Sequence, residues 1–358
     1  KMTFIDSLRN YLSPQILVIL CLGFISGVPY GVLMDPLNYW LSEEGIEKST
    51  IGLLSLVFLI YSLKVFWAPL VDRLKIPRLH RLGQRKSWLF LSQFVTGLII
   101  LSISFVEPKE SLNIFVYLIL AIGFFSATQD ICADALRIEL VEKRELGEAS
   151  AVFVIGWRIG AILLSGVATF YLAEFFGWNF AYQMIGIIVI FLSFIFLILI
   201  KEPTREIRPP KDFFKEPLGW FEDSFLAPLK DLYLRYKNHL LLLLLLIFTY
   251  RLSDMFLGPM AMPFYRETGF TKIEVAEITN FYGLIMTILG GLFAGASVYR
   301  FGLSKNLVAG AILTPLTNLP FIYLNMIGHD VNFLILTITL DNFTPVSYTH
   351  LTLPTIFA

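Results

Sequence analysis

The amino-acid sequence predicts an all-α protein that crosses a membrane many times. Hydrophobic residues make up 56% of the 358-residue chain. Charged residues make up 16%, whereas they make up about 25% of soluble domains. The apolar residues gather into nine stretches and the start of a tenth, each close to the roughly 20 residues that a membrane-spanning helix needs. The net charge is zero, which excludes the basic excess of a nucleic-acid-binding protein.

The spans follow one another along the whole chain and are separated by short polar segments. Residue 1 is Lys, so we expect the natural start to lie upstream. The spans are predicted at residues 15–41, 51–71, 88–106, 112–136, 149–173, 180–200, 240–264, 281–299, 307–327 and from 332 onward.

The distribution of Lys and Arg predicts the orientation of these spans. With the N-terminus in the cytoplasm, 21 of the 28 Lys and Arg residues fall in cytoplasmic segments and 4 in external loops. Cytoplasmic loops of membrane proteins are enriched in these residues. We therefore predict a multi-pass protein with a cytoplasmic N-terminus. The external residues are Lys48, Lys109, Arg266 and Lys272.

A polar connection divides the spans into two groups. Residues 201–239 follow the sixth span and contain 8 basic residues, 7 acidic residues and 5 prolines. We predict a cytoplasmic linker here. It would join an N-terminal six-span bundle, residues 1–200, to a partial C-terminal bundle, residues 240–344, that holds spans 7 to 10.

A weak internal repeat supports this division. At an offset of 224 residues, Gly45 matches Gly269 and Lys48 matches Lys272, after spans 1 and 7 respectively. Two complete six-span repeats would need roughly 450 residues, so we expect this chain to stop inside its tenth span. Without the remaining spans, the chain as given is expected not to transport.

The last residues differ from the apolar stretch before them. Residues 345–358, PVSYTHLTLPTIFA, have no apolar continuity and look like a translated cloning or sequencing artefact. We predict a non-native tail. The alternative is a natural short C-terminus after nine spans.

Ionisable and amide side chains inside the spans are the candidate binding residues. Such groups are costly in a bilayer and usually face a water-filled cavity or a partner. A structural ion pair is the alternative for each of them. The candidates are Asp35, Lys64, Gln129, Asp130, Asp134, Arg158, Arg251, Asp254 and Asp341.

Spacing predicts some of their partners. Asp130 and Asp134 are four residues apart and share one helix face, which Arg137 continues. Arg251 and Asp254 are three apart and could pair within one helix. Lys64 and Arg158 have no partner on their own helix, so their counter-charges must come from other spans or a ligand.

Other residue types offer no further site. The four histidines lie outside the apolar stretches, so a carboxylate is the better candidate for carrying protons. Cys21 and Cys132 are expected to be buried thiols. We predict no catalytic or metal site. Gly156 and Gly160 have the spacing of helix-packing residues.

The loop after the second span resembles the loop signature of the major facilitator transporters. It contains Asp72 and Arg73, preceded by Ala68, and then Gly83, Arg85 and Lys86. Longer motifs resemble the AmpG muropeptide permeases. They are GFISGVP at 23–29, KVFWAPLVDR at 64–73, GQRKSW at 83–88, SATQD at 126–130, GWRIG at 156–160 and EPT at 202–204.

This resemblance implies a major facilitator fold and a function. It implies a complete N-terminal six-helix bundle and an incomplete C-terminal bundle. It also implies a monomeric proton symporter of the bacterial inner membrane. Such a protein would import anhydro-muropeptides, sugar-peptide fragments of the cell wall, for peptidoglycan recycling, with a proton gradient and no cofactor.

The resemblance also implies where the substrate would bind. Spans 1, 4, 7 and 10 would line the central cavity, and each carries a carboxylate: Asp35, Asp130, Asp254 and Asp341. Asp130 would bind or couple protons. Lys64 and Arg158 would tune the pKa of Asp130 or hold carboxylates of the ligand, and Gln129 would contact sugar or peptide. The loop residues Asp72, Arg73, Gly83, Arg85 and Lys86 would take part in gating.

Two alternatives remain open. A related carrier for acetyl-CoA or another nutrient would have the same fold. An intramembrane prenyltransferase could use the D-x-x-x-D pattern of residues 130–134 to hold Mg²⁺-diphosphate. Such enzymes need a second Asp-rich motif, and the sequence contains none, so we do not expect an enzyme.

Overall fold

The structure is a computed structural model that describes residues 13–74, 76–141, 146–200, 260–290 and 316–342. It also describes the single positions 202, 219, 230, 234, 237, 258 and 313. These residues form helices and the turns between them, with no strand among them. Most of the predicted linker, the predicted tail and the first part of the predicted span 7 lie outside the described residues.

The first predicted span is a long helix with a break near its far end. Helix α2 (Pro14–Leu33) begins where the Ser13 hydroxyl caps the backbone N–H of Ile16 at 3.4 Å. Helix α3 (Asp35–Glu43) continues it after Met34, whose φ of −88° and ψ of −107° are not helical. The break lies two residues before Pro36, which has no N–H to donate to a carbonyl of the preceding turn.

The second predicted span is a chain of short helical pieces. They are α4 (Lys48–Leu54), η1 (Ser55–Val57), α5 (Phe58–Leu63), η2 (Lys64–Phe66) and α6 (Ala68–Arg73). The tighter 3₁₀ turns η1 and η2 interrupt the α-helix. At the first interruption, the Ser55 hydroxyl donates to the carbonyl of Ile51 at 3.1 Å, a local bond that is known to bend helices.

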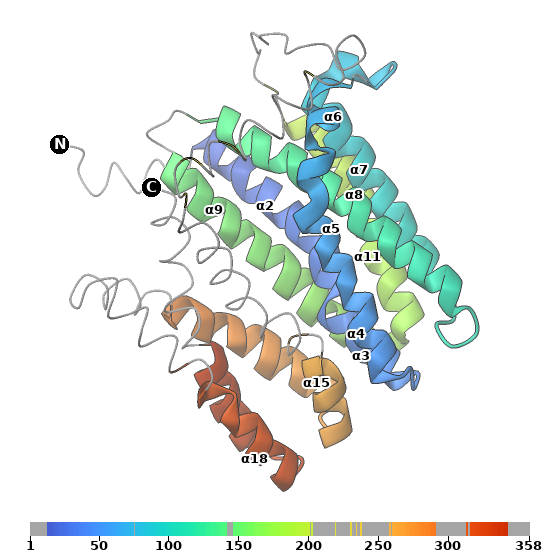
Figure 1. The fold of residues 1–358 in the computed structure, drawn as a ribbon, viewed down its shortest axis with the longest axis vertical. Helices are drawn as coiled ribbons and strands as arrows, with labels where there is room; N and C mark the ends of the chain where they lie inside the picture. The colour runs from blue at the N-terminus through green and yellow to red at the C-terminus, as the bar shows by residue number, and fades with distance from the viewer. Residues whose placement is uncertain are drawn as a thin grey trace, which may run out of the picture.

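The other N-terminal spans match their predicted positions. Helix α7 (Gln84–Ile103), helix α8 (Leu112–Glu139) and helix α11 (Trp178–Leu199) are continuous. The fifth span consists of α9 (Leu146–Arg158), the wider π-helical segment η5 (Ile159–Ala168) and α10 (Thr169–Phe176). Figure 1 shows these helices side by side in one bundle.

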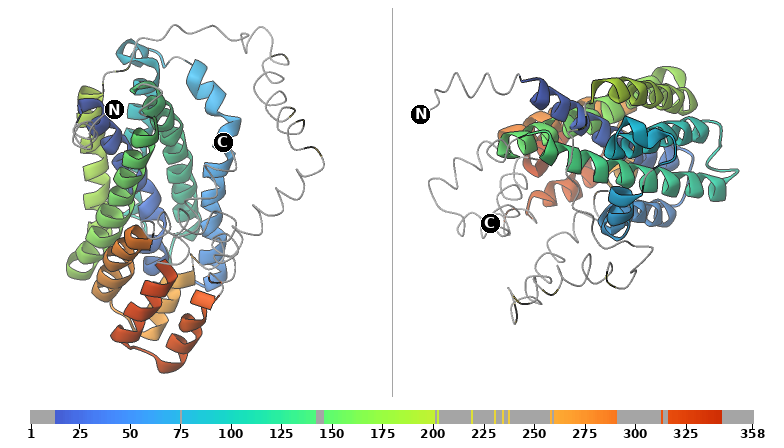
Figure 2. Two further views of the ribbon diagram at one scale, coloured as in Figure 1. Left: turned by 90° about the vertical axis from the view of Figure 1, so that its left-hand side faces the viewer. Right: turned by 90° about the horizontal axis from the view of Figure 1, so that it is seen from above.

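The described C-terminal helices pack against one end of this bundle, as Figures 1 and 2 show. They are residues 260–268, α15 (Lys272–Glu274) with η8 (Val275–Tyr282), which continue as helix to residue 290, α18 (Leu319–Ile327) and residues 331–342.

One of these helices corrects the sequence analysis. The predicted span 281–299 begins nine residues too late, because the helix already begins at Lys272. A capping box starts it, in which Thr271 and Glu274 satisfy each other's backbone N–H groups. In total, the described residues contain 6 helices that are long and apolar enough to cross a membrane.

Glycines allow α2 and α9 to touch through their backbones. A Cβ atom on Gly156 would overlap the carbonyl oxygen of Leu20, and one on Gly160 would overlap that of Phe24. From the other side, a Cβ on Gly23 or Gly27 would overlap a carbonyl of α9. The packing role predicted for Gly156 and Gly160 is confirmed, and this close approach fixes the first span against the fifth.

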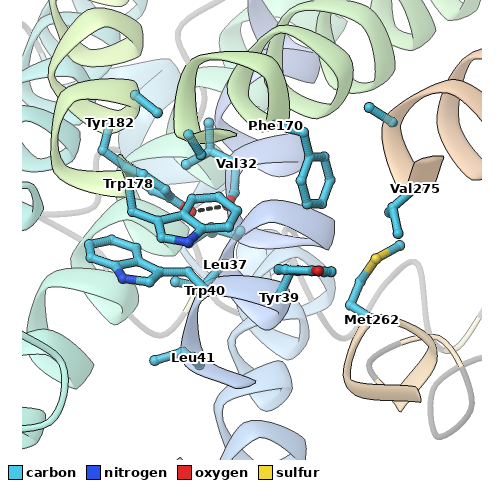
Figure 3. Packing of buried hydrophobic residues seen from close by; sticks show 14 of the residues in the cluster. Val32, Leu37, Tyr39, Trp40, Leu41, Phe170, Trp178, Tyr182, Met262 and Val275 are labelled. Atoms are coloured by element: carbon cyan, nitrogen blue, oxygen red, sulfur yellow. Dashed lines mark hydrogen bonds between the residues drawn. The ribbon is translucent and has the colours of Figure 1, made fainter. Parts of the chain in front are cut away.

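A buried hydrophobic cluster contains residues of both halves. Trp40 and Trp178 stack with ring centroids 6.0 Å apart, and the Tyr182 hydroxyl donates to the carbonyl of Val32 at 3.1 Å. Met262 and Val275 of the C-terminal half reach the same buried cluster, as Figure 3 shows. The described halves therefore share one hydrophobic core at the end of the bundle where α3 lies.

Candidate functional site

Lys64 is the centre of a charged cluster between the second and fourth spans. Its Nζ lies 3.5 Å from Asp130 Oδ2 and 3.2 Å from Asp134 Oδ2. Arg137, one helical turn further along α8, lies 3.3 Å from Asp134 and over the ring of Phe153. The counter-charge that the sequence requires from another span is therefore supplied to Lys64 by α8.

This cluster is electrically balanced. It combines two cations, Lys64 and Arg137, with two carboxylates, Asp130 and Asp134. The Asp130 side chain is 18% exposed, so water reaches it only in part. If one carboxylate takes up a proton, the cluster acquires a net positive charge and the Lys64 ammonium loses an acceptor. The arrangement can therefore exchange a proton for an anionic group.

Polar and aromatic side chains surround Asp130. The Ser26 hydroxyl of α2 is buried near its carboxylate and makes no hydrogen bond to another described residue. Tyr61 is close enough to act on it electrostatically, and the Tyr61 hydroxyl donates to Ser126 at 2.8 Å. The Tyr61 ring meets Tyr30 edge to face at 5.2 Å. Hydroxyl groups and ring faces together suit a ligand with both polar and apolar surfaces.

Gln129 points away from the charged cluster that contains its neighbour Asp130. It is fully buried, and its amide donates to the carbonyl of Ile25 at 2.9 Å, which ties α8 to α2. In this conformation the side chain lies buried between two helices, and its expected contact with sugar or peptide stays a prediction.

Asp35 and Asp341 lie near the ends of their helices. Asp35 opens α3 directly after the break at Met34, where the positive end of the helix dipole favours a carboxylate. Asp341 lies near the end of the helix 331–342. Both lie close enough to Tyr265, in the C-terminal half, to act on it electrostatically. The place of Asp35 and Asp341 in a central cavity stays a prediction.

The remaining candidate residues within the spans are Arg158, Arg251 and Asp254. Arg158 is the last residue of α9, directly before the π-helical segment η5, and it is partly buried. Arg251 and Asp254 lie outside the described residues, so their predicted pairing stays a prediction.

The loop signature forms a second charged cluster at the other end of the bundle, where Figure 1 shows α6. The Arg85 guanidinium lies 3.2 Å from Asp72 and 2.8 Å from Glu139. Glu202 accepts the backbone N–H groups of Arg85 and Lys86 at 3.2 and 3.0 Å. A carboxylate is stabilised at this position because the first N–H groups of a helix have no partner within it.

Gly83 makes the Glu202 contact possible. Its φ of 122° is strained for any residue with a Cβ, and a Cβ there would overlap the Glu202 carboxylate. The Arg73 side chain lies outside the described residues. The gating role of these loop residues stays a prediction.

Sequence reasoning did not identify four residues that the structure places in these clusters: Tyr30, Tyr61, Glu139 and Glu202. Each contacts a partner from a distant part of the chain. The motif EPT at 202–204 was one signal for Glu202, but nothing local indicates that its carboxylate caps α7.

Comparison with known proteins decides the family. A sequence profile of the Major Facilitator Superfamily matches residues 17–351. The chain belongs to the Major Facilitator Superfamily. Solved structures of this fold agree. A variant of the nucleoside transporter NupG has a TM-score of 0.63, covers 94% of this chain and 81% of its own, and is 13% identical.

A second solved structure is an inward-facing, unoccupied bacterial homologue of the human lysosomal transporter Spinster. It has a TM-score of 0.55 and 16% identity, and the match covers 95% of this chain and 74% of that one. At these identities the likeness shows the major facilitator fold alone.

Within the superfamily, the curated relatives include AmpG transporters. A transporter named AmpG 4 of Rickettsia conorii is 39% identical over 327 residues, which cover 91% of this chain and 77% of the relative. The anhydromuropeptide permease of Escherichia coli is 33% identical over 312 residues, which cover 87% of this chain and 61% of the permease. The resemblance to the AmpG group that the motifs predicted is confirmed.

Proposed function

We propose that the protein is a proton-coupled symporter that imports anhydro-muropeptides through a bacterial inner membrane. The observation that carries the proposal is the cluster of Lys64, Asp130 and Asp134 inside a major facilitator bundle. The AmpG names of the relatives supply the substrate class. The N-terminus is cytoplasmic in this proposal, in agreement with the count of Lys and Arg.

Asp130 is the coupling carboxylate in this proposal. While it is ionised, it shares the Lys64 ammonium with Asp134. When it takes up a proton from the external side, Lys64 keeps Asp134 as an acceptor and can accept a carboxylate of the ligand in place of Asp130. A charge-assisted hydrogen bond of this kind is roughly twice as strong as a neutral one. Release of the proton to the cytoplasm lets Asp130 reclaim Lys64 and weakens ligand binding.

The surroundings of Asp130 suit a sugar-peptide ligand. Such a ligand presents carboxylates to Lys64, and hydroxyl and amide groups to Ser26 and Tyr61. The rings of Tyr30 and Tyr61 offer faces for its apolar edges. No enzymatic step and no cofactor enter this cycle, because the proton gradient supplies the free energy. A single chain acts alone, since both halves of the fold form one pathway.

The test is uptake of labelled anhydro-muropeptide by right-side-out vesicles that contain the full-length protein. We expect uptake when the outside is more acidic, and loss of uptake when an uncoupler removes the gradient. Acidification of the vesicle interior without muropeptide uptake would support proton transport by the protein and would indicate another solute as its substrate. Muropeptide uptake that an uncoupler leaves unchanged would contradict the coupling.

A further inference from the structure

The internal repeat is visible as two identical turns. After α3, the N–H of Gly45 donates to the carbonyl of Ser42 at 3.1 Å, and that of Ile46 donates to Leu41 at 3.0 Å. After residues 260–268, Gly269 donates to Arg266 at 3.1 Å, and Phe270 donates to Tyr265 at 3.0 Å. This pair of bonds, with a glycine of positive φ, is the Schellman helix end. The two glycines have φ values of 77° and 98°.

Every residue of the second turn lies 224 positions after its counterpart in the first, the offset that the sequence repeat predicts. At the same offset, Glu267 is the counterpart of Glu43, and Lys272 is the counterpart of Lys48. Each half therefore presents a glutamate before its turn and a lysine after it.

These four charges pair reciprocally between the halves. Lys48 of the first half lies 2.7 Å from Glu267 of the second. Lys272 of the second half lies 3.1 Å from Glu43 of the first. A reciprocal exchange of equivalent partners is what a two-fold axis generates at a symmetric interface, and here the internal repeat supplies an approximate axis within one chain.

The two pairs differ in their surroundings. Lys48 and Glu267 have side chains that are 58% and 50% exposed, so their attraction is weakened by water and salt. The Lys272 side chain is only 15% exposed. It lies over the Trp178 ring at 5.4 Å, and the Trp178 indole N–H donates to Glu43 at 2.5 Å. The Lys272–Glu43 pair is therefore the stronger of the two.

Hydrogen bonds between the halves support the same contact. Arg266 reaches the Ser42 hydroxyl at 3.4 Å, and the Tyr39 hydroxyl donates to the carbonyl of Phe270 at 3.0 Å. Figure 1 shows α3 and α4 beside α15 at this end of the bundle, away from α6 and the loop cluster.

We infer that Lys272–Glu43 and Lys48–Glu267 form a reciprocal charge latch that closes the mouth of the transport pathway at the end of the bundle opposite the loop cluster. The latch must break before a ligand reaches the interior from that side. Water solvates all four charges once they separate, so the latch can open and reclose. This inference rests on the transport role proposed above, but on neither the substrate nor the proton coupling.

The test measures access to a buried position beneath the latch. Asn280 is 7% exposed and lies against Gly166 of η5, between the halves. In a background with Cys21→Ser and Cys132→Ala, Asn280→Cys is a reporter for a membrane-impermeant maleimide added to right-side-out vesicles. Labelling requires neither muropeptide nor a proton gradient, so the result is separate from that of the uptake assay.

The expected result is a graded increase in the labelling rate. Lys272→Ala should raise it about tenfold, which corresponds to ~1.4 kcal/mol. Glu43→Ala should raise it by less than Lys272→Ala, because Glu174 remains 3.9 Å from Lys272. Lys48→Ala should raise it by about twofold or less, since exposed pairs contribute little. Lys272→Arg keeps the charge and should stay near the reporter background. Lys109→Ala, a change at an exposed loop lysine, is the matched control.

Two results would overturn the latch. One is a labelling rate for Lys272→Ala and Glu43→Ala equal to that of Lys109→Ala. The other comes from a cross-link between Ser42→Cys and Arg266→Cys, made with a reducible bifunctional thiol reagent that spans the length of the Arg266 side chain. The cross-link should block labelling until it is reduced. Labelling that persists through the cross-link would contradict the latch. An increase seen only in inverted vesicles supports the latch but reverses the predicted orientation.

Discussion

The Lys64 ammonium lies 3.5 Å from the Asp130 carboxylate, across the contact between the second and fourth spans. The 3₁₀ turn η2 places Lys64 at this position, and the uninterrupted helix α8 presents Asp130 and Asp134 on one face. A cation shared by two carboxylates responds to the protonation of either one. We propose that this response couples the movement of the proton to that of the ligand.

Lys64→Ala should weaken substrate binding. We expect the KM for muropeptide uptake to rise at least tenfold, because a hydrogen bond to a charged group contributes about 1.5–3 kcal/mol. Lys64→Arg should recover part of the affinity, since it keeps the charge but not the geometry. The measurement is the initial uptake rate against substrate concentration, with Lys109→Ala as control. An unchanged KM in Lys64→Ala would remove Lys64 from the binding site.

Gly156→Ala should destabilise the bundle. The added Cβ would overlap the carbonyl of Leu20 on α2, and overpacking of this kind costs about 1–3 kcal/mol. We expect a lower Tm for the purified protein in detergent. Gly258→Ala is the matched control, because a Cβ there meets nothing within 4 Å and alanine favours helix over glycine. Equal Tm values for the two variants would contradict the close contact between α2 and α9.

Arg85→Ala should also lower the Tm. It removes one ion-pair partner from each of Asp72 and Glu139. Breaking a buried pair costs roughly 3–5 kcal/mol, and we expect the lower end because the Asp72 side chain is 42% exposed. Lys86→Ala keeps the backbone N–H that Glu202 accepts, so its Tm should stay close to the parent value. A Tm for Arg85→Ala that matches Lys86→Ala would show that the cluster contributes nothing to stability.

The apolar stretches predicted most of the fold because a bilayer demands about 20 apolar residues in each spanning helix. They did not predict the start of the helix at Lys272, because Lys272, Glu274 and Glu277 interrupt the apolar pattern in its first turns. The capping box of Thr271 and Glu274 was the local signal that could have placed this helix correctly.

The site was predictable where its residues share one helix. The four-residue spacing placed Asp130 and Asp134 on one face, and the structure brings both to Lys64. Contacts between distant segments were not predictable in this way. Gln129 carries the same polar signal as its neighbour Asp130, yet it faces the carbonyl of Ile25, because adjacent residues on a helix point in different directions.

Substrate-driven proton movement through Asp130 tests this coupling most directly. The full-length protein is placed in vesicles with a pH-sensitive dye inside, and anhydro-muropeptide is added outside without an imposed gradient. We predict that the parent protein acidifies the interior, and that Asp130→Asn does not, while it still exchanges labelled for unlabelled substrate. Acidification by Asp130→Asn at the parent rate would contradict the account.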